Sequence, residues 1–204
     1  MLFEDTYRTI EKPAEGQFRD RGSKFLAYAH PVAVENELKN ILAHLKSEHP
    51  KANHHCWAVR FGIDRSVFRI NDDGEPSGTA GRPILNTLLS RDITNILVVV
   101  VRYFGGTLLG VPGLINAYKT ATEEALKTAL VVDKTFNDIY TIEFDYLQMN
   151  DIMKIIKDDN LSIISQAFDN NCSIQVSIRK TQVNQTLSKF NKLPGVVVKY
   201  SHTL

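Results

Sequence analysis

The chain has few cysteines, a single tryptophan and almost no net charge. Its 204 residues include two cysteines, and the formal net charge is +1. Cys56 and Cys172 lie far apart in sequence, which gives no sign of a disulfide framework or of a zinc knuckle. Basic nucleic-acid-binding domains usually have a strong excess of Lys and Arg. Residues 1–132 and 133–204 carry net charges of +1 and zero, so neither half has that excess.

Long apolar runs and the standard phosphate-binding motifs are also absent. The longest aliphatic run, Ile96–Val101, has the length of a strand and is far shorter than the ~20 residues of a membrane-spanning helix. The first residues, MLFEDTYRTIEK, contain no apolar signal core, so we expect a cytoplasmic protein without a membrane partner. Neither GxGxxG nor the Lys-Ser/Thr ending of a P-loop occurs, so no standard nucleotide site is indicated.

Residues 133–204 have a regular pattern of strands and helices. Four segments have the alternation or composition of strands: Thr135–Tyr146, Leu161–Phe168, Cys172–Arg179 and Val196–Tyr200. Two segments have apolar residues at helical spacing: Leu147–Asp159 and Thr181–Leu193. Asp169-Asn170-Asn171 is the expected hairpin turn, because Asn and Asp tolerate left-handed backbone, and Thr181 is the expected helix cap. The order βαββαβ predicts a ferredoxin-like C-terminal domain.

Residues 1–132 are less regular and predict an α+β domain. Four segments have the composition of strands: Ser23–Pro31, His55–Phe61, Val67–Asn71 and Ile96–Val101. Three have helical spacing: Val34–Glu48, Pro83–Leu89 and Pro112–Leu130. Gly62-Ile63-Asp64-Arg65 is the expected turn of a hairpin. Because every residue of Ile96–Val101 is apolar, we expect a central strand buried on both faces. Val131–Lys134 is the expected junction between the two domains.

Two glycine-rich loops, each followed by a predicted helix, stand out from the rest of the chain. The first is Asp72-Asp73-Gly74-Glu75-Pro76-Ser77-Gly78-Thr79-Ala80-Gly81, and the second is Arg102-Tyr103-Phe104-Gly105-Gly106. Loops held by rigid elements often carry function. Both runs resemble the signature of the YigZ/IMPACT family. Ser23-Lys24-Phe25, Pro31-Val32 and Ala52–Ala58 add to the resemblance, which extends over about residues 16–130.

The resemblance implies a two-domain bacterial protein. Its N-terminal domain is expected to resemble the second domain of a small-subunit ribosomal protein fold, and its C-terminal domain the last domain of elongation factor G. Eukaryotic relatives in the IMPACT branch regulate translation by competing for an activator of the starvation-responsive initiation-factor kinase. Leu108 and Asn116 stand where the family commonly has Lys and Arg. Those two departures weaken the case for phosphate binding in this chain.

The Arg102–Gly106 loop has a functional and a structural interpretation. Arg102 ends a buried strand at the side where α/β layers usually bind ligands, and Tyr103 and Phe104 are suited to stacking on bases. Gly105 and Gly106 would let the backbone approach a ligand closely. In the alternative, Arg102 pairs with a carboxylate such as Asp72 or Asp73, and the aromatic side chains fill the core.

The acidic loop likewise has two interpretations. Asp72, Asp73 and Glu75 are hard oxygen donors that suit Mg²⁺ or a basic partner. In the alternative, the loop is a tight turn in which Ser77 or Thr79 caps the following helix. The sequence favours a structural or partner-binding role over a metal site. We therefore expect no resident metal ion.

His54 and His55 begin a predicted strand, so their side chains should face opposite sides of the sheet, and either one is a candidate general base. We expect a non-enzymatic regulatory module that binds RNA, the ribosome or a translation-associated protein, without a cofactor. One alternative is an enzyme that acts on a small phosphorylated or nucleotide ligand with a divalent cation. Another is a protein-interaction adaptor that binds no ligand.

Overall fold

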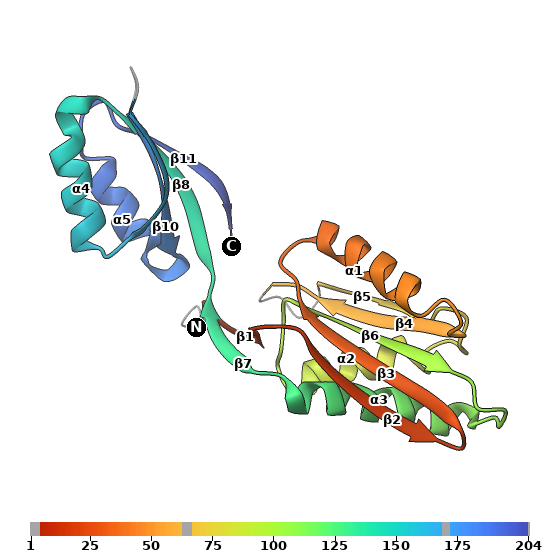
Figure 1. The fold of residues 1–204 in the computed structure, drawn as a ribbon. Helices are drawn as coiled ribbons and strands as arrows, with labels where there is room; N and C mark the ends of the chain where they lie inside the picture. The colour runs from red at the N-terminus through yellow and green to blue at the C-terminus, as the bar shows by residue number, and fades with distance from the viewer. Residues whose placement is uncertain (1–4, 63–66, 169–171, 204) are drawn as a thin grey trace. The chain divides into compact units, whose positions relative to one another are not determined.

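The computed structural model describes residues 5–62, 67–168 and 172–203, in two compact units (Figure 1). The N-terminal unit is Tyr7–Lys134. The C-terminal unit is Thr135–Leu204 together with the start of the chain up to Thr6. The turns expected at 62–65 and 169–171 fall at least in part outside the described residues.

The N-terminal unit is built on a five-stranded antiparallel sheet with the order β2-β3-β6-β4-β5. Its strands are β2 (Ala14–Asp20), β3 (Ser23–Pro31), β4 (His54–Arg60), β5 (Phe68–Asn71) and β6 (Ile96–Tyr103). The first seven residues of β6 are all buried. The predicted central strand is therefore confirmed, because only a strand with neighbours on both edges and helices on both faces hides such a run.

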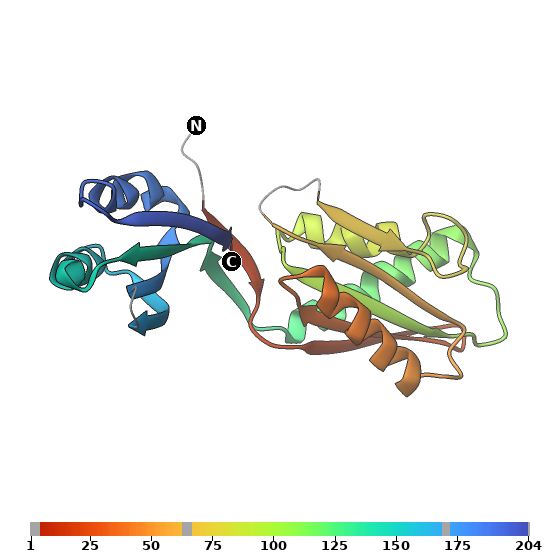
Figure 2. The same ribbon diagram turned by 90° about the horizontal axis from the view of Figure 1, so that it is seen from above.

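Three helices cover the two faces of this sheet: α1 (Glu35–Glu48), α2 (Gly81–Ser90) and α3 (Gly110–Thr128). Figure 2 shows α1 on one side of the sheet and α2 and α3 on the other. Side chains alternate along β6, so Val98 and Val100 belong to the core under α2 and α3, whereas Val99 and Val101 belong to the core under α1.

Three strands were not expected from the sequence: β1 (Thr6–Ile10), β2 and β7 (Val131–Thr135). β1 and β7 pair with each other, so the segment expected as a junction forms most of a strand. In β2, Gly16 resembles a strand breaker in sequence. A Cβ atom at Gly16 would lie 2.1 Å from the backbone nitrogen of Ala125, so the glycine is needed for close contact with α3.

The C-terminal unit has the expected βαββαβ order. Its elements are β8 (Asn137–Phe144), α4 (Met149–Asp158), β9 (Ser162–Phe168), β10 (Cys172–Arg179), α5 (Val183–Phe190) and β11 (Val197–Thr203). The sheet is antiparallel with the order β11-β8-β10-β9, and both helices lie on the same face of it (Figure 1). Ile142, Ile174 and Val176 of the sheet share one core with Ile152 and Phe190 of the helices.

Asp5 belongs to the C-terminal unit and explains the role of Thr181. The Asp5 carboxylate accepts hydrogen bonds from Arg179 Nε and Nη2, both at 2.8 Å, and from the Thr181 hydroxyl at 2.7 Å. The predicted cap at Thr181 is wrong, since α5 has no side-chain cap and the hydroxyl serves Asp5. The hydrogen bonds from Arg179 hold the pKa of Asp5 well below its usual range.

Candidate functional site

A buried ion pair lies at the end of β6. Arg102 Nη1 donates to Glu75 Oε1 at 2.5 Å, and the Tyr118 hydroxyl donates to the same oxygen at 2.7 Å. The side chains of Arg102 and Glu75 are 6% and 3% exposed. The Arg102 guanidinium lies 5.4 Å from the ring centre of Phe25 and 5.6 Å from that of Phe104. Arg102 therefore pairs with Glu75 rather than with Asp72 or Asp73.

This ion pair lines a cavity of about 360 Å³, which we call the Arg102 cavity. The other lining residues are Asn53, His54, Pro76, Phe104, Leu108, Leu109, Gly110, Val111 and Leu114. Three of them are large apolar side chains open to solvent: Phe104 is 45% exposed, Leu108 81% and Val111 52%. The cavity thus combines a polar base, where the charges of Glu75 and Arg102 offset each other, with an apolar rim.

His54 lines the cavity, whereas His55 points away from it. His54 Nδ1 donates to the backbone oxygen of Asp73 at 2.8 Å, and its Nε2 lies 3.9 Å from Glu75 Oε1. The next residue of β4, His55, has its side chain on the opposite face because side chains alternate. His55 is 8% exposed, and burial lowers the pKa of its imidazole. Only His54 is placed to contact a ligand in the cavity.

Asp72 and Asp73 hold the acidic loop in shape. Asp72 Oδ1 accepts from the backbone N–H groups of Ala80 and Gly81 at 3.1 and 2.8 Å, and Oδ2 accepts from that of Gly78 at 2.8 Å. Asp72 therefore satisfies the first amides of α2, the task that the sequence assigned to Ser77 or Thr79. Asp73 Oδ2 accepts from the His55 N–H at 2.6 Å. The next predicted site residue, Ser77, is exposed and outside the cavity lining.

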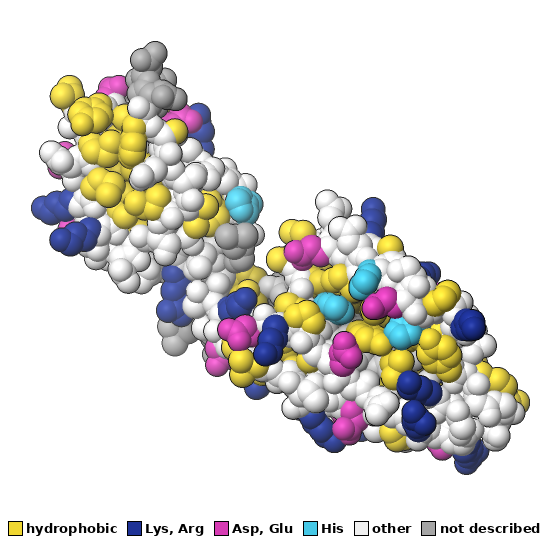
Figure 3. All heavy atoms as spheres, in the orientation of Figure 1, with side chains coloured by type: hydrophobic (Ala, Val, Ile, Leu, Met, Phe, Trp, Pro, Cys, Tyr) yellow, Lys and Arg dark blue, Asp and Glu magenta, His cyan; other side chains and the backbone are white. Residues whose placement is uncertain are grey.

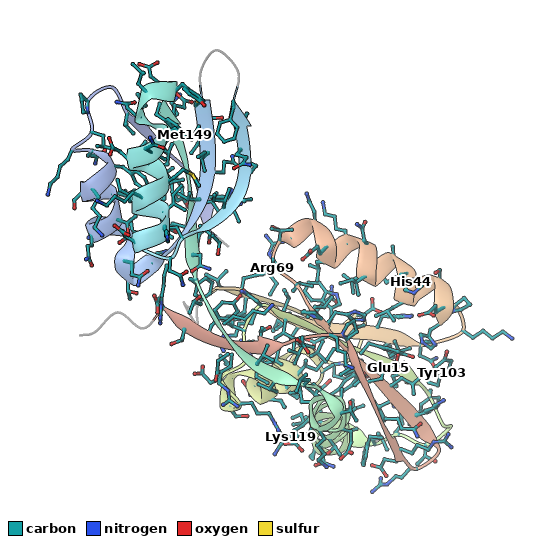
Figure 4. All side chains as sticks on the ribbon, turned by 60° about the vertical axis from the view of Figure 1, so that its left-hand side comes forward. Glu15, His44, Arg69, Tyr103, Lys119 and Met149 are labelled. Atoms are coloured by element: carbon teal, nitrogen blue, oxygen red, sulfur yellow. The ribbon has the colours of Figure 1, made fainter. Side chains whose placement is uncertain are left out.

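Tyr103 and Phe104 are separated by the sheet. The Tyr103 hydroxyl is 2.9 Å from His49 Nδ1, and His49 Nε2 is 2.7 Å from the Tyr28 hydroxyl. Figure 4 shows Tyr103 on the side of α1 and Lys119 on α3. Tyr103 is thus part of a Tyr–His–Tyr cluster under α1, and only Phe104 lines the Arg102 cavity.

The two glycines of the loop serve the fold. A Cβ atom at Gly105 would lie 1.9 Å from the backbone carbon of Gly22, so Gly105 permits close contact with the β2–β3 turn. Gly106 has a φ of +86°, a backbone conformation that favours glycine. Their presence is explained by the protein's own backbone, without a ligand.

The carboxylates do not converge on one point. Within the described ranges, no group of three or more His, Cys, Asp or Glu side chains is placed to hold a metal ion. The alternative in which Asp72, Asp73 and Glu75 together hold Mg²⁺ is therefore wrong, because the first two bind backbone amides and Glu75 binds Arg102 and Tyr118.

Tyr118 was missed by the sequence interpretation. It is fully buried on α3, and its hydroxyl joins Glu75 to Cys56, whose Sγ lies 3.3 Å away. Burial raises the pKa of both the Cys56 thiol and the Tyr118 hydroxyl. Leu109, Val111 and Leu114 were missed as well. A clue to them was present in the sequence. Leu108 and Leu109 directly precede α3 and Val111 lies in its first turn, and none of the three belongs to the regular apolar stripe of that helix.

A second cavity, of about 400 Å³, lies between α2 and α3 and is lined in part by Arg82, Ile115 and Lys119. None of the site residues predicted from the sequence lines it. Figure 3 shows Lys and Arg side chains dispersed among acidic and apolar ones on the face in view. Within residues 5–62, 67–168 and 172–203, no helix is long and apolar enough to cross a membrane.

Comparison with known proteins supports the resemblance seen in the two loops. Residues 21–126 match the family model described as the Impact N-terminal domain. An IMPACT family member of Haemophilus influenzae is 33% identical over 172 residues, which are 83% of this chain and 84% of the relative.

The IMPACT family member YigZ of Escherichia coli is 34% identical over 170 residues, 82% of this chain and 83% of the relative. A solved structure described as a hypothetical protein is 27% identical, covers 96% of this chain and 97% of its own, and has a TM-score of 0.74. With the family model covering more than half of its residues, the chain belongs to the IMPACT family.

Proposed function

We propose that the protein is a non-enzymatic regulatory module of translation that binds a protein component of the translation machinery through the Arg102 cavity. The link to translation rests on the resemblance to IMPACT relatives that regulate it. The choice of a protein partner rests on one observation: the apolar rim of Phe104, Leu108 and Val111 surrounds a base whose charges are already offset.

The state of the polar groups supports a binding role over a catalytic one. Glu75 is held in place by Arg102 and Tyr118 through Oε1, which fits a structural role for its carboxylate. The Cys56 thiol and the Tyr118 hydroxyl stay protonated at neutral pH, because burial raises the pKa of each. A nucleophile needs an accessible, activated group, and these two groups are neither.

The same site favours protein over RNA. A phosphate group needs an accessible cation, but Arg102 is 5% exposed and paired with Glu75. Leu108 replaces the lysine common in the family, and it is 81% exposed. Exposed apolar side chains around a concave site are typical of protein interfaces. On the ribosome, this site would therefore contact a ribosomal protein or a bound translation factor.

The domain analogies belong to the same proposal. Domains of 1–132 and 133–204 would resemble a small-subunit ribosomal protein domain and the last domain of elongation factor G. The βαββαβ order and the sheet order β11-β8-β10-β9 support a ferredoxin-like assignment for the second domain. The C-terminal domain would then offer a second contact surface.

The test is co-sedimentation with a purified ribosome fraction at low and near-physiological salt. We expect Leu108→Asp to weaken binding at least about tenfold, because it places a charge on the apolar rim. Val34→Asp is the matched control, since Val34 is 55% exposed, belongs to the N-terminal unit and does not line the Arg102 cavity. Because Arg102 is paired with Glu75 and the other described residues that line the cavity include no Lys or Arg, binding should change little with salt. Equal binding by both variants, or a steep loss with salt, would refute the proposed site.

A further inference from the structure

We infer that the Arg102 cavity recognises an aromatic side chain that carries a hydrogen-bond donor, namely tryptophan or tyrosine of the partner, and that His54 Nε2 accepts this hydrogen bond. The inference rests on the proposed function and names the chemistry of its partner. It follows from the hydrogen bonds of His54, from the free oxygen of Glu75 and from the shape of the apolar rim.

The hydrogen bond of His54 determines which ring nitrogen accepts. The backbone oxygen of Asp73 can only accept, so His54 Nδ1, at 2.8 Å, must carry the proton. In the neutral imidazole, Nε2 is then a hydrogen-bond acceptor. Its neighbour in the cavity is Glu75 Oε1, 3.9 Å away, which is beyond hydrogen-bond distance and forms an ion pair with His54 only when the imidazole is protonated. The inference therefore applies to the neutral form of His54, and the test is made at a pH where the imidazole is neutral.

Glu75 adds a second acceptor beside the first. Its Oε1 atom accepts from Arg102 and Tyr118, and among residues 5–62, 67–168 and 172–203 no group donates to Oε2. Both Glu75 and His54 line the cavity, so a ligand that covers them removes these acceptors from water. A purely aliphatic ligand would leave them without partners, which is unfavourable, whereas an N–H or O–H donor would satisfy one.

The rim favours an aromatic ring as the carrier of that donor. Phe104 is stacked on Arg102, yet 45% of it is exposed, and Leu108 and Val111 extend the apolar surface beside it. A cavity of about 360 Å³ has room for a bicyclic ring. Tryptophan and tyrosine combine a large apolar surface with one donor, and they are enriched at the centres of protein interfaces. A nucleotide fits less well, because no accessible cation of the cavity lining is free to bind its phosphate.

The test uses two probes of nearly the same size and shape, indole and benzothiophene, in which sulfur replaces the N–H donor, titrated into the 204-residue protein by NMR. Shifts of the Phe104 and Val111 amides report binding. We expect indole to bind about 2- to 12-fold more tightly, the ratio that one hydrogen bond gives. In His54→Asn the side-chain amide still donates to Asp73 but does not reach the position of Nε2, so this preference should disappear while both probes still bind. A preference that persists in this variant would show that Glu75, and not His54, accepts the hydrogen bond.

Three results would overturn the inference: equal affinity for the two probes, no shift of the rim amides with either, or tighter binding of uridine or guanosine monophosphate than of indole. The ribosome experiment is independent of this one. Donor preference with unchanged ribosome binding by Leu108→Asp would support the inference and refute the proposed function. If Leu108→Asp loses ribosome binding but indole binds no more tightly than the second probe, the proposed function is supported and the inference is refuted.

Discussion

Replacing Arg102 by alanine should destabilise the N-terminal unit strongly. The side chains of Arg102 and Glu75 are 6% and 3% exposed, and Arg102 Nη1 lies 2.5 Å from Glu75 Oε1. Removing the guanidinium leaves the Glu75 carboxylate buried without its ion-pair partner, although the Tyr118 hydroxyl still donates to it. It also leaves a void between Phe25 and Phe104, where the guanidinium is stacked.

The expected magnitude is about 3–5 kcal/mol, the cost of breaking a buried ion pair by removing one partner. A typical domain has a free energy of unfolding of roughly 5–15 kcal/mol, so this is a large share. Lys127→Ala is the matched control. Lys127 Nζ and Glu124 Oε1 are also 2.5 Å apart, but their side chains are 59% and 36% exposed, and such a pair contributes at most about 1 kcal/mol.

Urea unfolding followed by tryptophan fluorescence would measure the effect. The single tryptophan, Trp57, lies on β4, so its emission reports on the N-terminal unit. We expect the midpoint to fall by about 2 M urea in Arg102→Ala and by little in Lys127→Ala. The double variant Arg102→Met with Glu75→Gln should regain most of the loss, since no unpaired charge remains. Equal costs for the two single substitutions would show that burial does not determine the strength of the Arg102–Glu75 pair.

Three further predictions concern other parts of the chain. The folded-state pKa of Asp5 lies below its usual value, so the stabilising effect of Asp5 on the C-terminal unit is complete above about pH 4 and is lost as the pH falls toward the folded-state pKa. Asp5→Asn should therefore make the stability of this unit less sensitive to acid. Urea midpoints followed by circular dichroism between pH 7 and 3 would measure the difference. Gly105→Ala should cost about 1–3 kcal/mol in the fluorescence assay, because its Cβ would clash with the Gly22 backbone, and an unchanged midpoint would refute that contact. Cys56 and Cys172 are buried, and burial raises the pKa of the Cys56 thiol. Neither thiol should therefore react with a thiol reagent until the protein unfolds, and rapid labelling of the native protein would contradict this.

Several elements were predictable because a local pattern is enough to specify them. The all-apolar run Ile96–Val101 predicted a central strand, and the alternating segments of residues 133–204 predicted the βαββαβ order. Both rest on periodicity, which the sequence contains directly. The two glycine-rich loops identified the family, and Arg102, Phe104, Glu75 and His54 were among the candidate residues that the structure brings together.

Strands of mixed polar composition were not predictable. β2 is a polar edge strand, and β1 and β7 form only when distant segments of the chain meet. The stability of β2 comes from its pairing with β3 and its contact with α3, and that of β1 and β7 comes from their pairing with each other. None of these contacts leaves a clear local pattern in the sequence. Gly16 shows the difficulty, since the same residue indicates a break in sequence and a close contact in space.

By itself, the sequence determined the family, the main strands and helices, and the pair of loops that carry the candidate site. Only the tertiary structure decided which side chains of those loops meet. Arg102 pairs with Glu75 and not with Asp72, and Tyr103 faces away from Phe104. The physical reason is that the direction of a side chain depends on the register of its strand and on the turn of its loop. These are set by contacts between residues far apart in the chain.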